Sequence, residues 1–296
     1  MKLTLKGDTM KTLEEIKAMD RKQRNALVDE LYALIETNDI ERVKAFLQEY
    51  PLQESFYEAN IKDGTYKLFL FHVEYVLAKA AMAYEKYKDP AMIEFLQEWG
   101  LRIDYHHNGY GRNALTSYIE KGGEDEVVIK YLLDKGLTCE KRGDGNFGWT
   151  PMHYWAGHNN YKALKIAITK VGANVDVKDK FDETPLFRAV QKSPAYKATQ
   201  ILIEFGANVN YYTGGYTPLD KAQGARNKKL LKDAGAQGSD SKAFRKIKHE
   251  VYLAFGVDLN SRKSFDENYH KLTDEQHAEI DKLINQGIAE MMSKGK

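Results

Sequence analysis

A repeat of about 34 residues runs through the middle of the chain, and it constrains the fold more than any other feature of the sequence. Thr-Pro pairs begin at steps of 34 and 33 residues, at Thr150, Thr184 and Thr217. Glycines follow a matching rhythm, at steps of 36, 36 and 34 residues, at Gly100, Gly136, Gly172 and Gly206. Two independent landmarks with one period indicate stacked units, because a unit of this size cannot bury its apolar face alone.

Each unit has the pattern of two helices followed by an extended loop. Threonine is a good N-cap and proline is favoured at the first helical position, so each Thr-Pro pair predicts a helix start. Each glycine follows an amphipathic run such as "YKATQILIEFG" (196–206) and predicts the left-handed end of a second helix. The segment after it, such as "ANVNYYTGGY" (207–216), predicts a hairpin loop that leads to the next Thr-Pro pair.

These motifs resemble the ankyrin repeat, whose consensus couples Thr-Pro-Leu-His to a terminal Gly-Ala-x-Val-Asn. The resemblance is strong over about 100–236 and reaches 31–51 by helical pattern, with Asn38 in the left-handed turn where the family uses glycine. It implies an all-α ankyrin solenoid of about six repeats, the last with Asp220 in the histidine position and a shortened second helix. It also implies a non-catalytic module that binds another protein.

The segments outside the repeats are predicted to be helical. Capping boxes begin at Thr12 and Thr273, and 240–255 carries an apolar helical face that Gly256 ends. We expect three regions: an N-terminal extension or capping helix at 1–23, repeats at 24–236 with the first two divergent, and a C-terminal helical extension at 237–296. The last region is predicted to hold two helices packed on the final repeat.

The histidines and the single cysteine fit structural roles. His153 is the histidine of Thr-Pro-Met-His, which the ankyrin resemblance assigns to hydrogen bonds within and between neighbouring turns. His158 falls in a turn with no third ligand nearby, so we expect no metal site and no cofactor. Cys139 shares an apolar column with Val175 and Val209, which predicts a small core side chain rather than a nucleophile.

Charge and composition narrow the partner class. Lys+Arg (44) and Asp+Glu (43) nearly cancel, so no global basic field favours nucleic acid or an acidic membrane. The basic stretch 221–248 is interpreted as the polar face of a terminal cap. One cysteine suits a reducing compartment, and no apolar span reaches membrane length. We expect a cytosolic protein, monomeric when free, or one delivered into a host-cell cytosol if it is a bacterial effector.

Aromatic residues in the predicted loops are the feature that the scaffold does not require. Eight of them occupy four consecutive loop tips: Tyr105 and Tyr110, then Phe147 and Trp149, then Phe181, then Tyr211, Tyr212 and Tyr216. Such rings bury much area at little entropic cost, and Arg112 and Arg188 would add cationic contacts. The sequence therefore predicts a protein partner on an aromatic-rich concave face, with some rings packed between neighbouring loops. The alternative is an effector or toxin-like protein whose repeats target it and whose flanking helical segments carry the activity.

Overall fold

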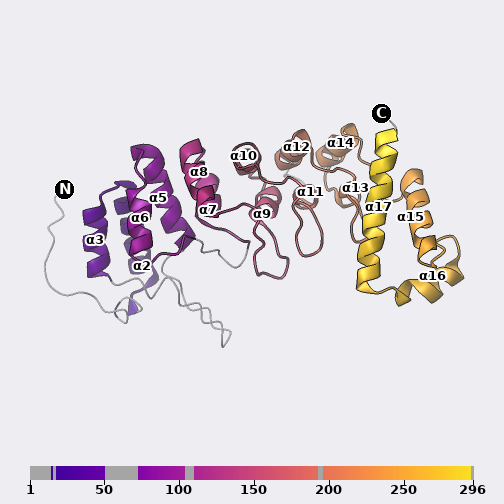
Figure 1. Ribbon diagram of the computed structural model, residues 1–296, viewed down its shortest axis with the longest axis horizontal. Coiled ribbons are helices and arrows are strands. Elements are labelled where there is room, and N and C mark those ends of the chain that lie inside the picture. The colour runs from indigo at the N-terminus through magenta and orange to yellow at the C-terminus, as the bar shows by residue number, and fades with distance from the viewer. Residues whose placement is uncertain (1–14, 16–17, 51–72, 104–109, 193–195, 295–296) are drawn as a thin grey trace. The chain divides into compact units, whose positions relative to one another are not determined.

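The computed structural model describes residue 15 and residues 18–50, 73–103, 110–192 and 196–294 (Figure 1). The described chain is all-α: its only β feature is an isolated bridge between Thr213 and Tyr216. Contacts divide the chain into two compact units, 1–145 with 169–173, and 146–168 with 174–296. None of the described helices is long and apolar enough to cross a membrane.

The first unit consists of helices that pack side by side in antiparallel pairs (Figure 1). They are α2 (Arg21–Glu36), α3 (Ile40–Glu49), α5 (Val73–Tyr87), α6 (Ala91–Glu98), α7 (Ala114–Glu120) and α8 (Glu126–Asp134). Helix α5 is central and contacts α2, α6, α7 and α8. The turn between α2 and α3 passes through Asn38 at φ 57°, which confirms the predicted left-handed position. The capping box predicted at Thr12 lies outside the described residues.

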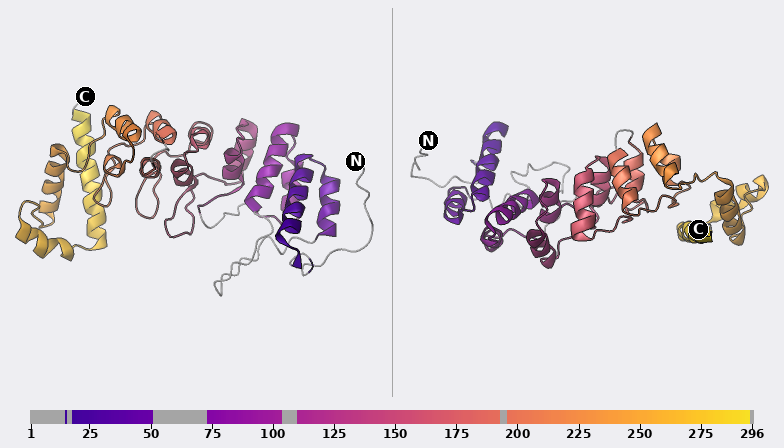
Figure 2. Two further views of the ribbon diagram at one scale, coloured as in Figure 1. Left: turned by 180° about the vertical axis from the view of Figure 1, so that it is seen from behind. Right: turned by 90° about the horizontal axis from the view of Figure 1, so that it is seen from above.

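The second unit also contains paired helices and ends in a separate group of three (Figure 2). Its elements are α9 (Pro151–Gly157), α10 (Tyr161–Ile166), the start of the π-helical turn η1 (Ala167–Val171), whose last three residues belong to the first unit, α11 (Pro185–Val190), α12 (Tyr196–Glu204), α13 (Pro218–Lys221), α14 (Ala225–Asp233), α15 (Lys242–Ala254), α16 (Arg262–Asn268), the 3-10 turn η2 (Tyr269–Lys271) and α17 (Asp274–Lys294). Helices α9 and α11 pack against each other, and α12 covers both.

The predicted helix starts and ends are confirmed. The Thr-Pro pairs begin α9, α11 and α13, with each threonine an extended N-cap and each proline in the first turn. The four repeat glycines all have positive φ: Gly100 at 113°, Gly136 at 83°, Gly172 at 74° and Gly206 at 84°. A residue with a side chain is strained in this region, so the spacing of these glycines sets where each second helix ends.

The shortened helix of the last repeat is the first of the pair, so the prediction that the second is short was wrong. Helix α13 has 4 residues, whereas α14 has 9. The chain turns extended at Ala222, and the N–H of Gln223 donates to the carbonyl of Val190 on α11 (2.8 Å). Gly224 at φ 79° then begins α14. This backbone bond to the neighbouring repeat ends α13 after one turn.

The predicted apolar column after each glycine is buried only in part. Cys139 is 1% exposed and Ile103 is 9% exposed, whereas Val175 and Val209 are half-buried. Burial raises the pKa of the Cys139 thiol, so the thiol is held in its protonated and unreactive form. The prediction that Cys139 is a core side chain is confirmed.

Cys139→Val is expected to leave the fold intact, because valine has a similar volume and needs no hydrogen bond. The free energy of unfolding, measured by urea titration, should change by less than about 1.5 kcal/mol. The native thiol should also react with a soluble disulfide reagent only as the protein unfolds. Fast labelling of the folded protein would contradict the burial of this side chain.

The C-terminal helices form their own apolar core around one residue of the last repeat. Phe244, Tyr252, Ile280 and Ile284 are buried together with Tyr212, which lies in the loop before α13. Thr273 caps α17 with the capping box that the sequence predicts, and Ser241 caps α15. Helix α16 is a third helix of this region, and the sequence pattern did not predict it. Helix α17 lies beside α15 in all views (Figure 2).

Candidate functional site

Three aromatic rings on two neighbouring loops of the second unit gather around one arginine of helix α11. The ring of Phe147 is stacked on Trp149 (centroids 5.1 Å apart) and lies 6.0 Å from Phe181. The guanidinium carbon of Arg188, on α11, lies 5.0 Å from the ring centroid of Trp149 and 5.9 Å from that of Phe147. We call these four residues the aromatic cluster. Phe147 and Phe181 remain 50% and 56% exposed.

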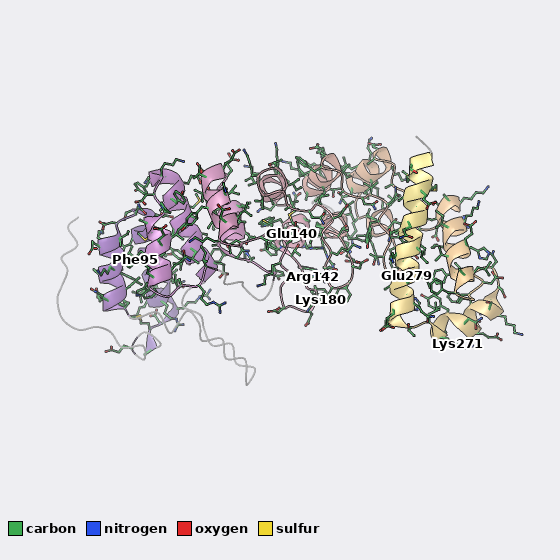
Figure 3. The ribbon with its side chains drawn as sticks, viewed as in Figure 1. Phe95, Glu140, Arg142, Lys180, Lys271 and Glu279 are labelled. Carbon is green, nitrogen blue, oxygen red and sulfur yellow. The ribbon has the colours of Figure 1, made fainter. Side chains whose placement is uncertain are left out.

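The backbone of the two loops brings the rings together. The N–H of Lys180 donates to the carbonyl of Phe147 (3.1 Å), which ties one loop to the next. Gly148 separates Phe147 from Trp149 at φ 59°, and a Cβ there would meet the side chain of Lys180 at 2.3 Å. Glycine is favoured here, because the left-handed backbone strains other residues and a Cβ would displace the lysine side chain. Figure 3 labels Lys180 on the end of its loop, on the side away from α12.

Asp179 supports the aromatic cluster through hydrogen bonds to one loop and an ion pair with Arg188. Its side chain is fully buried, and Oδ1 accepts hydrogen bonds from the N–H groups of Phe181 (2.8 Å) and Glu183 (3.1 Å). Its Oδ2 forms an ion pair with Arg188 at 2.8 Å. Arg188 also pairs with Glu183 at 2.7 Å. One buried carboxylate thus fixes both the loop that presents Phe181 and the arginine that supports Trp149.

The charge of Arg188 is balanced within the cluster. Its side chain is 14% exposed and contacts two carboxylates, those of Asp179 and Glu183. Burial raises the pKa of Glu183, and the nearby Arg188 lowers it in part. Arg188 already has two acidic partners, so its charge is neutralised within the cluster. The accessible surface of the aromatic cluster is therefore mainly the apolar surface of its rings. Arg112, in the first unit, also pairs with a carboxylate, that of Glu120.

The remaining loop aromatics have different surroundings. Tyr216 is 47% exposed, with the Lys221 ammonium 3.4 Å from its ring centroid. Tyr211 is 8% exposed, and its hydroxyl contacts Lys178 and Asp182. Tyr212 is 2% exposed in the C-terminal core. Tyr110 is half-buried in the first unit, and Tyr105 lies outside the described residues. The structure thus brings together Phe147, Trp149, Phe181 and Arg188 but leaves no accessible ring at Tyr212.

The histidine of the Thr-Pro-Met-His motif has the predicted bonds. His153 is buried, and its Nδ1 accepts from the N–H of Thr150 (3.3 Å) and lies 2.8 Å from the hydroxyl of the same residue. Its Nε2 then donates to the carbonyl of Glu183 in the next repeat (2.9 Å). His158 is exposed and stacks on Tyr154, with centroids 4.2 Å apart. The part of the chain that the structure describes has no group of three potential metal ligands.

The first unit contains a cavity that sequence reasoning missed. It has a volume of about 1040 Å³ and lies between α2, α5 and the turn before α8. Its lining combines aromatic, apolar and charged side chains, among them Tyr32, Tyr75, Met82 and Lys121. The sequence did not indicate this cavity. Helix α5 has no Thr-Pro pair at its start, so the repeat pattern could not show which residues of α5 face its neighbours. Small side chains at Ala78 and Ala83 leave the space open.

Comparison with known proteins identifies the family of the repeats. Residues 77–179 match the family described as ankyrin repeats, in three copies. Among solved structures, the ankyrin repeat domain of human ASB11 is similar over 70% of this chain and 84% of that chain, with 18% sequence identity and a TM-score of 0.43. No curated protein sequence matches the chain. The family match runs from within α5 to Asp179, the residue that holds the aromatic cluster.

Proposed function

We propose, from the premise that this chain is an ankyrin repeat protein, that its repeats bind a protein partner with the aromatic cluster at the centre of the contact. Ankyrin repeats are in general protein–protein interaction modules, and this fold is typically non-catalytic. The observation that carries the proposal is the exposure of Phe147 and Phe181 at 50% and 56% beside a stacked tryptophan. Rings of this kind dominate the binding energy of protein interfaces.

The rigidity of the aromatic cluster supports this proposal. Asp179 fixes the loop of Phe181, and Gly148 allows the loop of Phe147 to approach it. A contact surface that is ordered before binding loses less conformational entropy when the partner arrives. Since the charge of Arg188 is already balanced by carboxylates, the partner surface opposite the cluster is expected to be apolar at its centre.

The exposed fraction of each remaining loop aromatic decides whether we include it in the proposed binding face. Tyr216 is included, because half of its surface is accessible and it follows the same kind of loop as Trp149. Tyr211 and Tyr212 are left out, because their rings are buried. The core that α15–α17 share with Tyr212 favours a capping role for this region over an activity of its own. We also propose a cytosolic location, which a single free and buried cysteine suits.

The test is affinity capture with a paired set of variants. Phe147→Ala combined with Phe181→Ala should remove the exposed rings of the aromatic cluster without opening the core. A buried aromatic anchor contributes on the order of 2 kcal/mol or more at an interface, about thirtyfold in Kd. The partner captured by the wild-type chain should therefore be lost from the double variant, and its measured Kd should rise more than tenfold.

Phe205→Ala is the matched control, since Phe205 is also exposed (36%) but follows α12, away from the cluster. This variant should retain the partner, and all three proteins should have similar melting temperatures. Capture of the same protein by the wild type and both variants would show that the contact lies elsewhere on the chain.

A further inference from the structure

A second cavity lies in the second unit, where the loop before α13 meets the C-terminal helices. Its volume is about 550 Å³, within the usual range of roughly 300–1,000 Å³ for sites that hold small ligands. The loop contributes Tyr212, Gly214 and Gly215, and the helices contribute aromatic and charged side chains. Asn285 fastens the two parts: its side chain accepts from the N–H of Tyr212 (2.8 Å) and donates to the carbonyl of the same residue (2.7 Å).

Aromatic rings form much of the wall of this cavity. Tyr252 and Tyr269 are stacked with centroids 5.9 Å apart, and Phe265 lies 4.6 Å from Tyr269. One cation already contacts an aromatic ring here: Nζ of Lys248 lies 5.8 Å from the ring centroid of Tyr212. Aromatic faces attract ammonium and guanidinium groups through the negative potential of the ring.

The acidic side of the cavity is built around Asp281 on α17. Its Oδ2 accepts a hydrogen bond from the N–H of Gly214 (2.9 Å), and it forms no ion pair with any described residue. Burial raises the pKa of this carboxyl; the negative charge of Asp182 adds to the rise, and His277 lowers it. A half-buried carboxylate without a counter-ion loses part of its hydration, and a bound cation would compensate for that loss.

We propose that this cavity binds an organic cation, with an ammonium or guanidinium group against Asp281 and its apolar stem against the tyrosine rings. The lining favours a cation over an anion, because the carboxylates of Asp274 and Asp281 outnumber the ammonium of Lys248 while the ring of His277 is neutral. Lysine and arginine side chains of proteins and free amines both carry the required group. The site is separate from the aromatic cluster, and the inference stands without the proposed function.

The experiment is a titration followed through the backbone amide of Gly214, whose proton is bonded to Asp281. Butylammonium chloride and an acetylated, amidated Gly-Lys-Gly peptide are added separately to the isotope-labelled full chain, and butyrate serves as the anionic probe. A saturable shift of the Gly214 signal with a cationic probe, and none with butyrate, is expected. Tighter binding of the peptide would assign the site to a protein side chain, and tighter binding of butylammonium to a free amine.

Three variants make the result specific. Asp281→Asn keeps an acceptor for Gly214 and should weaken cation binding by about tenfold, the order expected for a charged hydrogen bond. Lys248→Met removes the competing cation and should strengthen binding. Glu279→Gln is the control, since Glu279 lies on the same helix (Figure 3), pairs with Lys282 and is not among the residues that line the cavity. Equal binding by Asp281→Asn and the wild type, or saturable binding of butyrate, would overturn the proposal.

Discussion

Asp179→Ala is expected to lower the free energy of unfolding of the second unit by about 3–5 kcal/mol, the usual cost of removing one partner of a buried ion pair. The substitution leaves the N–H groups of Phe181 and Glu183 without the acceptor that now bonds them. Arg188 also loses a 2.8 Å ion pair, and Glu183 is then its one remaining acidic partner among the ion pairs of the described residues. The loop that presents Phe181 is therefore expected to loosen together with the loss of stability.

Urea titration followed by far-UV circular dichroism measures the first effect, and hydrogen exchange of the loop amides measures the second. Asp179→Asn should lose less stability, because an amide oxygen still accepts from the loop. Asp233→Ala is the control: this aspartate is exposed and pairs only with Lys229 on its own helix, so its removal should change stability by about 0.5 kcal/mol or less. An unfolding curve of Asp179→Ala that overlays the wild type would refute the supporting role given to this carboxylate.

Phe187→Ala is expected to have a similar effect on stability for a different reason. Phe187 is fully buried on α11, in the layer that α9 and α12 cover. Truncation of a buried phenylalanine removes apolar contacts and leaves a cavity, which typically costs about 3–5 kcal/mol. The matched variant Phe181→Ala, whose ring is 56% exposed, should change the free energy of unfolding by only about 0.5 kcal/mol.

The two phenylalanines lie six positions apart in one repeat, so they separate core from surface with the same substitution. Denaturant midpoints at unchanged slope give the comparison directly. If Phe181→Ala were as destabilising as Phe187→Ala, the aromatic cluster would be part of the core rather than an accessible surface.

Local chemistry explains what could be read from the sequence. A Thr-Pro pair starts a helix through its own side chain and ring, and a glycine at positive φ ends one through its own backbone. The glycine spacing placed Cys139 in the core, and the resemblance to the ankyrin motif, rather than the period, implied the hydrogen bonds of His153. Each of these features depends on residues within one repeat or on its nearest neighbour, so no distant contact was needed to predict them.

Tertiary structure alone decided which loop aromatics are accessible. Tyr212 and Phe147 occupy loops of the same kind, but the helices α15–α17 bury Tyr212, whereas Phe147 stays half exposed. The ion pairs of Arg188, the early end of α13 and both cavities likewise depend on side chains that meet across the fold. The exposure of a side chain is set by every element packed around it. Asn285, 73 residues after Tyr212, fastens that loop to α17, and no repeat pattern encodes such a distant contact.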